Sequence, residues 1–332
     1  CHRPSARGAA GTGPYQEPSS PLGSAVPRAI SMSDNARQHD EADPFDESFQ
    51  RRLEYLSLVS KRVFGGRTRA ERRSRKAGTG VEFADYRQYS AGDDYRYIDW
   101  NAYARMGRLL LRLYEEDEDL SVYLLIDRSA SMALGHPSKL FYAKRITAAL
   151  AYVSLAHLDR VAIVGLGEAP QPRLSPTRGR NRIFRVLAFL RSLNPEGGTD
   201  LSASLSAFVG QHKRRGLAIV VSDLFDPEHF SAGLDKLRYA RFETQVLQIT
   251  DPRDAAPSLH GDVTLRDAET HELRQVTITP RVLSRYREQY QEHQARVRHY
   301  CGDKHIPLLR LPLDVPAEDA VLRMLRRGGV VG

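Results

Sequence analysis

Cysteine is scarce in this chain of 332 residues, and long apolar runs are missing from it. The two cysteines, Cys1 and Cys301, lie near opposite ends of the sequence and suggest neither a disulfide framework nor a zinc site. A reducing cytoplasm is the simplest location for such a protein. No run of eighteen apolar residues occurs, so we expect no segment to span a bilayer.

Motifs of common enzyme classes are absent as well. The sequence contains no Gly-x-Ser-x-Gly elbow, no Walker sequence and no dinucleotide fingerprint. Ser129 and Ser131 have no histidine beside them in sequence, although His136 or His157 could approach them in space. No convincing nucleophile or base is present, and we therefore expect that the protein is not an enzyme.

The net charge is +8, but the excess of positive charge is local. Lys61–Lys76 holds eight Lys or Arg residues against one Glu, and residues 1–31 carry a net +2, which leaves the rest close to neutral. A basic run can follow phosphates or an anionic surface. Because Phe64 is its only aromatic residue, we favour a solvated or partner-facing loop over nucleic-acid binding.

The first 31 residues are rich in Pro, Gly, Ser and Ala and show no apolar periodicity. This composition predicts a disordered tail over residues 1–45. Met32 opens the sequence Met-Ser-Asp-Asn, an ordinary translation start, and we expect the biological chain to begin there. The alternative is that Cys1 is the lipidated first residue of a mature lipoprotein with a flexible tether.

One short run carries the clearest chemical signal. Asp127, Ser129 and Ser131 follow the apolar stretch Val122–Ile126, at the carboxyl end of an expected strand. One carboxylate and two hydroxyls offer only oxygen, which suits a hard divalent cation such as Mg²⁺. Ligands of open α/β sheets bind beyond this end of the strands. Taken alone, however, the run is better explained as the cap of a helix.

Two later segments bring oxygen donors to further strand ends. Gly197–Asp200 forms a turn that puts the Thr199 hydroxyl ahead of a helical run at Leu201–Phe208. Leu217–Val221 is typical of a buried parallel strand, and it ends in Ser-Asp-Leu-Phe-Asp, residues 222–226. Three strand ends thus present the same kind of donor. The pattern resembles the metal-ion-dependent adhesion site, and the chain resembles a von Willebrand factor A domain.

A long signature precedes this domain. Residues 78–89 read Gly-Thr-Gly-Val-Glu-Phe-Ala-Asp-Tyr-Arg-Gln-Tyr, and residues 92–105 read Gly-Asp-Asp-Tyr-Arg-Tyr-Ile-Asp-Trp-Asn-Ala-Tyr-Ala-Arg. The segment resembles the signature of the bacterial DUF58 family, whose members carry an A-type domain directly after it. The resemblance covers about residues 50–330.

The signature alternates aromatic residues with Asp and Arg, and two roles are open for it. It can form a binding face for a protein partner, or a structural clamp that joins a smaller module to the A domain. We expect Asp99, Trp100 and Arg105 to belong to the clamp. The charged residues among Asp93–Arg96 stay open between the two roles.

The order of the remaining elements predicts the fold class. After residue 118 strands and helices alternate, as in a doubly wound α/β fold with a mostly parallel sheet of the Rossmann type and helices on both faces. Asp262–Thr279 is expected to form a β-hairpin inserted before a long helix at Arg281–Tyr300. The predicted domains are a tail at 1–45, a signature module at 46–117 and the A-like domain at 118–330. Further helices are expected at 46–63, 140–158, 180–193, 232–240 and 317–326, and further strands at 160–166, 243–249 and 306–311.

The resemblance also implies roles for the site residues. Ser129, Ser131 and Thr199 would bind Mg²⁺ or Mn²⁺ directly, whereas the acids Asp127 and Asp223 would act through water. A cation held with little direct carboxylate charge stays electrophilic, and it attracts a carboxylate from a partner.

The function implied is a metal-dependent protein–protein interaction module that binds an acidic partner residue. The same resemblance implies a cytoplasmic adaptor or co-chaperone of a MoxR-type AAA+ ATPase. The alternatives are a Mg²⁺-dependent phosphohydrolase and a structural scaffold with a vestigial metal site.

Overall fold

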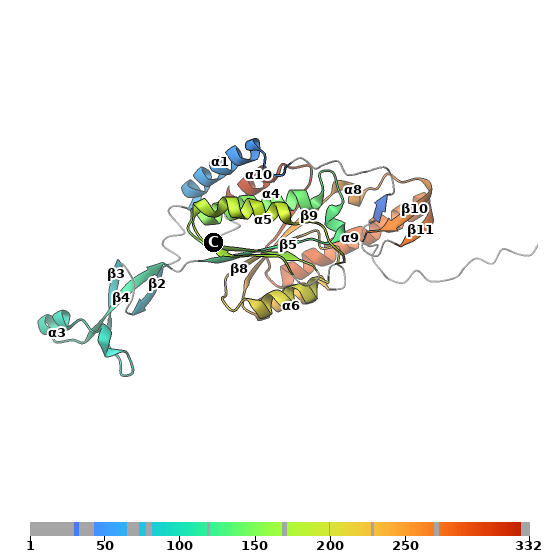
Figure 1. The fold of residues 1–332 in the computed structure, drawn as a ribbon. Coiled ribbons are helices and arrows are strands. Elements are labelled where there is room, and N and C mark those ends of the chain that lie inside the picture. The colour runs from blue at the N-terminus through green and yellow to red at the C-terminus, as the bar shows by residue number, and fades with distance from the viewer. Residues whose placement is uncertain are drawn as a thin grey trace, which may run out of the picture.

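The computed structural model describes residues 30–32, 43–64, 73–77, 82–117, 120–167, 171–198, 200–226, 229–268 and 272–326. A six-stranded sheet lies at its centre, and all of its pairings are parallel except that of β7 with β6. Helices cover both faces of this sheet (Figure 1), which confirms the predicted doubly wound α/β fold. The strand order is β12 (Leu308–Pro312), β9 (Glu243–Thr250), β8 (Leu217–Ser222), β5 (Ser121–Asp127), β6 (Arg160–Leu166) and β7 (Arg173–Thr177).

Strand β5 shows why the sheet needs helices on both faces, because all seven of its residues are buried. Val122, Leu124 and Ile126 belong to one apolar core, and Tyr123 and Leu125 belong to the other. A strand buried on both faces is apolar without interruption, as parallel strands are. The first core lies under α1 (Glu47–Phe64), α4 (Lys139–Ala156), α5 (Ile183–Ser192) and α10 (Ala317–Arg326), and the second under α6 (Leu201–Gln211), α7 (Phe230–Tyr239) and α9 (Pro280–Asp303). No helix in the described part of the chain is both long and apolar enough to cross a membrane.

The edge strand β7 is absent from the expectations drawn from sequence. It pairs antiparallel with β6, and of its five residues only Leu174 is buried. Pro176 lies within it, and proline is confined to edge strands because it cannot donate to the ladder. So short and polar a segment gives no periodic signal.

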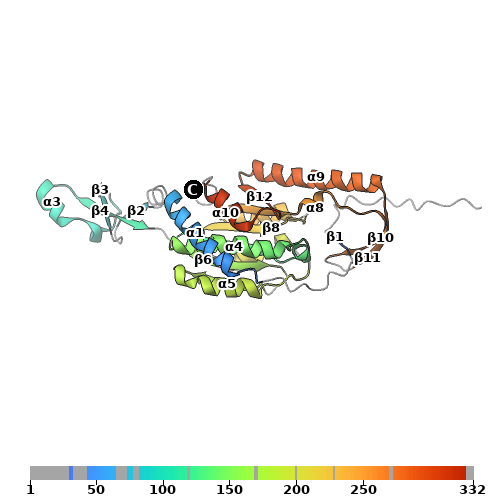
Figure 2. The same cartoon turned by 90° about the horizontal axis from the view of Figure 1, so that it is seen from above.

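Helix α1 packs on the α/β body, although its sequence position groups it with the signature module. Phe49, Leu53 and Leu56 are at most 2% exposed and belong to the core shared with α4 and α10. Leu58 lies on the opposite face and is 63% exposed. The smaller module therefore begins after α1, because the apolar stripe of this helix is covered by the body. Figure 2 shows α1 above α4 and beside α10.

The expected tail at 1–45 is structured where it can be described. Phe45 is 1% exposed in the main core, and Asp43 forms an ion pair with Arg191 at 2.8 Å. The three-residue strand β1 (Ile30–Met32) pairs antiparallel with β10 (Gly261–Asp267), so the expectation of disorder is wrong at these positions. Residues 1–29 and 33–42 lie outside the described residues. The inserted hairpin is confirmed, with β10 paired to β11 (Leu273–Ile278).

A second, three-stranded antiparallel sheet lies beyond one end of the main sheet in both views (Figures 1 and 2). We call it the arm: β2 (Arg73–Ala77), β4 (Leu110–Asp117) and β3 (Glu82–Gln88) in that order, with α3 (Trp100–Met106) between β3 and β4. The chain leaves β4 and enters β5 at its amino end. The arm and the carboxyl end of β5 therefore lie at opposite ends of that strand.

The docking of α1 can be tested by two matched substitutions in that helix. We expect Leu53→Ala to lower the free energy of unfolding by about 2 to 5 kcal/mol, because it opens a cavity in the core. Leu58→Ala has the same change in chemistry on the exposed face and should cost no more than about 0.5 kcal/mol. Urea unfolding of the full chain measures both. Equal effects would show that α1 is not held by the body.

Candidate metal centre

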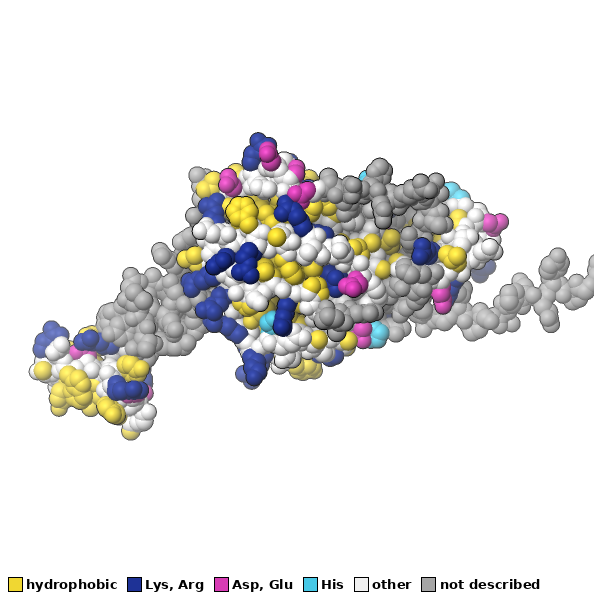
Figure 3. Space-filling model, in the orientation of Figure 1, with side chains coloured by type: hydrophobic (Ala, Val, Ile, Leu, Met, Phe, Trp, Pro, Cys, Tyr) yellow, Lys and Arg dark blue, Asp and Glu magenta, His cyan; other side chains and the backbone are white. Residues whose placement is uncertain are grey.

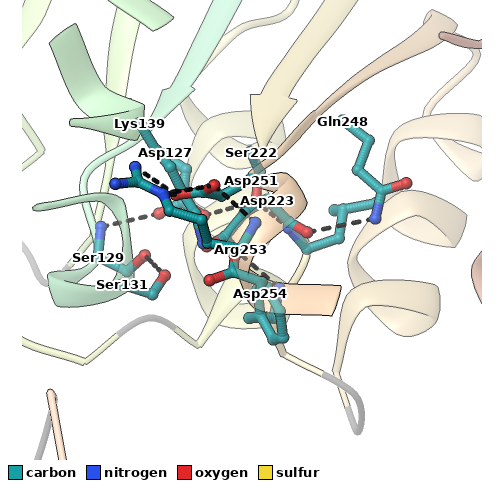
Figure 4. A network of polar contacts seen from close by, with 12 residues as sticks. Asp127, Ser129, Ser131, Lys139, Ser222, Asp223, Gln248, Asp251, Arg253 and Asp254 are labelled. Carbon is teal, nitrogen blue, oxygen red and sulfur yellow. Dashed lines mark hydrogen bonds and ion pairs between the residues drawn. The ribbon is translucent and has the colours of Figure 1, made fainter. Parts of the chain in front are cut away.

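The acids and hydroxyls predicted from the sequence converge at the carboxyl ends of two neighbouring strands (Figure 4). Asp127 is the last residue of β5, and Asp223 follows directly after β8. Ser129 and Ser131 lie at the start of the short 3-10 helix η2 (Ala130–Ala133). They meet because β5 and β8 are parallel neighbours whose carboxyl ends share one edge. Thr199 lies outside the described residues.

Hydrogen bonds fix the Asp127 carboxylate. Its Oδ1 accepts the backbone N–H of Ser129 at 2.8 Å, and its Oδ2 accepts the hydroxyl of Ser222 at 2.6 Å. The Oγ atoms of Ser129 and Ser131 lie 2.9 Å apart. Each of these side chains is almost fully buried. The arrangement presents two hydroxyls beside a carboxylate that the backbone holds in place.

The centre carries excess negative charge. Burial, together with the nearby Asp223 carboxylate, raises the pKa of Asp127 to about 6. Asp127 and Asp223 are only 4% and 1% exposed, and the Asp223 charge disfavours the ionised form of Asp127 in these poorly screened surroundings. This all-oxygen set of donors fits a divalent cation of the Mg²⁺ or Mn²⁺ type.

One cation at this centre belongs to the chain itself, and the sequence analysis did not find it. The Lys139 ammonium lies 3.0 Å from Asp223 Oδ2 and 2.7 Å from Asp254 Oδ2 (Figure 4). Burial disfavours its charge, but the two carboxylates outweigh burial and raise the pKa of Lys139 above its ordinary value. Asp254 belongs to α8 (Pro252–Ala255), which follows β9. A third strand end therefore takes part in the centre, and no sequence spacing marks it.

The loop that precedes Thr199 is fastened to the first metal loop. Glu196 N–H donates to the Arg128 carbonyl at 2.7 Å, and the Arg128 guanidinium pairs with the Glu196 carboxylate at 2.8 Å. Ala130 N–H donates to the Gly197 carbonyl at 3.0 Å. Gly165 is required beneath this contact, because a Cβ there would lie 2.8 Å from Arg128 Cδ. These bonds bring residues 196–197 next to Ser129.

Asp200 and Asp226, the acids that end the two later oxygen-rich segments, have structural partners. The Asp200 carboxylate caps α6 by accepting Ala203 N–H at 2.8 Å. Asp226 Oδ2 accepts Leu201 N–H at 3.2 Å, and its Oδ1 lies 2.9 Å from His229 Nδ1. Both acids therefore serve to hold the start of α6, and their carboxylates lie near His229 on the surface.

The two histidines considered near Ser129 lie near opposite ends of α4. His157 caps the carboxyl end of α4, whereas the centre lies at the amino end of that helix. His136 is exposed, and its carbonyl accepts a hydrogen bond from Arg253 at 3.4 Å. His157 therefore lies at the far end of the helix from Ser129.

The arm contains the other cluster predicted from the sequence, and Asp99 is at its centre. This carboxylate accepts the Tyr86 hydroxyl at 2.7 Å and Arg112 Nε at 2.8 Å, and it also caps α3. These bonds hold the pKa of Asp99 well below its usual range. The expected clamp is thus internal to the arm, and Asp99 belongs to it. The prediction is wrong for Trp100 and Arg105, which are exposed because they lie on the outer face of α3.

The outer face of the arm is aromatic and basic, and Figure 3 shows apolar and basic side chains together at its tip. Its aromatic side chains are largely solvated, with Tyr95 69% and Trp100 59% exposed. A hollow of about 280 Å³ lies beside them, with Arg96 and Arg112 in its wall. The charged residues left open are partnered locally, because Asp94 pairs with Arg96 at 2.6 Å and Asp93 with Arg87 at 2.7 Å.

Comparison with known proteins identifies relatives over most of the chain. The family model of DUF58, a protein of unknown function, matches residues 85–298. An uncharacterized protein of Mycobacterium tuberculosis is 27% identical over 288 residues, which cover 84% of this chain and 90% of that protein. Another from Mycobacterium avium is 30% identical over 136 residues, which cover 40% of this chain and 80% of that protein.

Solved structures match the chain at low sequence identity and low TM-score. The conserved hypothetical protein BatB from Bacteroides thetaiotaomicron is 16% identical with a TM-score of 0.37, covering 63% of this chain and 98% of its own. A von Willebrand factor type A protein from Catenulispora acidiphila is 14% identical with a TM-score of 0.35, covering 65% of this chain and 44% of its own.

The raised pKa of Asp127 has a consequence for stability that can be measured. Because the folded pKa is about 6 and the unfolded value is about 3.9, the folded state binds more protons between those values. The stability of the metal-free protein should therefore fall as pH rises from about 4 to 6. We expect Asp127→Asn to raise the free energy of unfolding at pH 7.5 in EDTA by on the order of 1 to 3 kcal/mol.

Asp251→Asn is the matched control. Asp251 is as buried as Asp127, but its pKa is shifted in the opposite direction. Burial acts against its charge, but hydrogen bonds from Arg253 lower the pKa of Asp251 below its ordinary value. Its contribution to stability is present above the unfolded pKa and is lost as pH falls. Asp251→Asn should therefore destabilise at pH 7.5. Urea unfolding that shows destabilisation by both variants would contradict the assignment for Asp127.

Proposed function

Because the chain belongs to the DUF58 family, we propose that it is a protein-interaction module whose binding depends on a divalent cation. The observation that supports this most is the convergence of Asp127, Ser129, Ser131 and Asp223 at one sheet edge. The partner would place a carboxylate at the cation. A MoxR-type AAA+ ATPase, or a client of it, is the partner that the family resemblance implies, with this chain as adaptor or co-chaperone in the cytoplasm.

The residues of the centre support distinct tasks. The hydroxyls of Ser129 and Ser131, with Thr199, would hold Mg²⁺ or Mn²⁺ directly. The carboxylates of Asp127 and Asp223 already accept hydrogen bonds on both of their oxygens, which favours contact with the cation through water. When bound, the cation supplies an electrophilic position for an acidic side chain of the partner.

The chain itself orients the donors. Asp127 orders the first loop through Ser129 N–H, and Ser222 joins that loop to the end of β8 by donating to Asp127 while accepting Leu224 N–H at 2.9 Å. Donors held this way lose little freedom when a cation binds, which favours a preformed site. This non-enzymatic function needs no nucleophile or base.

Metal binding is the first test of the proposal. Isothermal titration of the purified chain with Mn²⁺ or Mg²⁺ should show one site. We expect Ser129→Ala combined with Ser131→Ala to abolish binding, because both direct hydroxyl ligands are lost. The control is Ser192→Ala with Ser206→Ala, whose hydroxyls bond to helix carbonyls away from the centre. Unchanged binding in the first double variant would refute the site.

Partner binding is the second test. A complex with the MoxR-type ATPase should require the cation and should be lost in EDTA and in Asp127→Ala, since that carboxylate lies at the centre. Asp43→Ala is the control, because Asp43 is an acid with an exposed ion pair on the body. Pull-down from purified components measures the complex. A complex that survives both EDTA and Asp127→Ala would place the contact elsewhere, with the outer face of the arm as the first candidate.

A further inference from the structure

Lys139 is an unusual residue at the proposed metal centre. Its side chain is 0% exposed, and its ammonium bonds to Asp223 and Asp254 while lying 4.7 Å from the centroid of the Phe225 ring. Burying an ammonium group costs free energy unless carboxylates pair with it. The two acids are therefore what keeps this cation inside the protein.

The position of Lys139 at the start of its helix is unfavourable for a cation. It is the first residue of α4, whose amino end is capped by Ser138 accepting Phe141 N–H at 3.1 Å. The helix dipole disfavours a cation at this end. Neither helix formation nor burial thus explains a lysine here, whereas the pairing with Asp223 does.

We propose that the Lys139 ammonium is a built-in counter-ion that competes with the divalent cation for the Asp223 carboxylate. The inference rests on the proposed metal centre and describes how its affinity is set. Asp223 Oδ2 accepts from Lys139, and a cation brought to this acid meets the ammonium in surroundings that screen charge poorly. Lys139 stabilises the metal-free fold and, by the same contact, weakens metal binding.

Asp254 adjusts this competition because it neutralises part of the ammonium charge. It lies on α8 with its side chain 25% exposed, and its carbonyl accepts the Tyr286 hydroxyl from α9 at 2.8 Å. Asp254 is therefore the member of the three that a contact on the surface can reach. Without its charge, Lys139 would interact with Asp223 alone and would oppose the metal more strongly.

Isothermal titration with Mn²⁺ tests the competition on the full chain. We expect Lys139→Met to bind Mn²⁺ about tenfold more tightly than the wild-type chain and to melt at a lower temperature in EDTA. Asp254→Asn should bind about tenfold more weakly. The control is Lys304→Met, which makes the same change in net charge at an exposed position after α9 and should leave the affinity within about twofold.

A supporting lysine would give the opposite result. If Lys139 only holds Asp223 in place, Lys139→Met binds Mn²⁺ more weakly, and that outcome overturns the proposal. If this variant does not fold in EDTA, the competition is tested by comparing the single variant Asp254→Asn with the double variant that combines Lys139→Met and Asp254→Asn. The double variant must bind more tightly than Asp254→Asn alone. A wild-type chain that binds no Mn²⁺ would instead refute the metal centre itself.

Discussion

Two carboxylates buried at adjacent strand ends impose the main constraint on this protein. Asp127 and Asp223 are taken from water by the parallel packing of β5 and β8, and that packing buries both faces of the sheet. Charge left at such a place must be neutralised, hydrogen-bonded or paired. The Ser222 hydroxyl and the Lys139 ammonium are the groups that meet this demand.

Under the proposed metal binding, two cations compete at the centre: the internal Lys139 ammonium and a divalent ion from solution. The internal ammonium keeps the metal-free fold stable, and the hydroxyls of Ser129 and Ser131 favour a small divalent ion. The affinity for the divalent cation then depends on the difference between two large charge interactions. A small movement of α8 at Asp254 can change this difference. Such a balance suits an adaptor that must both bind and release.

The architecture separates the metal centre from the arm. The centre lies at the carboxyl end of β5, while the arm joins the amino end of the same strand. Asp99 joins β3, β4 and α3 of the arm through Tyr86, Arg112 and the cap of α3, while Trp100 lies on the outside. The molecule therefore offers two chemically different regions: the acidic, buried candidate metal centre and the aromatic, exposed outer face of the arm. A single large partner would have to span the length of β5 to reach both.

The sequence by itself determined the fold class and predicted most residues of the candidate metal centre. Continuous apolar strands such as Val122–Ile126 indicate a parallel sheet, and parallel topology places the residues after each strand at one edge. Asp127, Ser129, Ser131 and Asp223 could be predicted for that reason. Tertiary structure alone decided that Lys139 and Asp254 join them, that α1 packs on the body, and that Trp100 faces solvent. These three features depend on which helix faces pack together across long sequence separations. Neither local periodicity nor residue spacing encodes such packing.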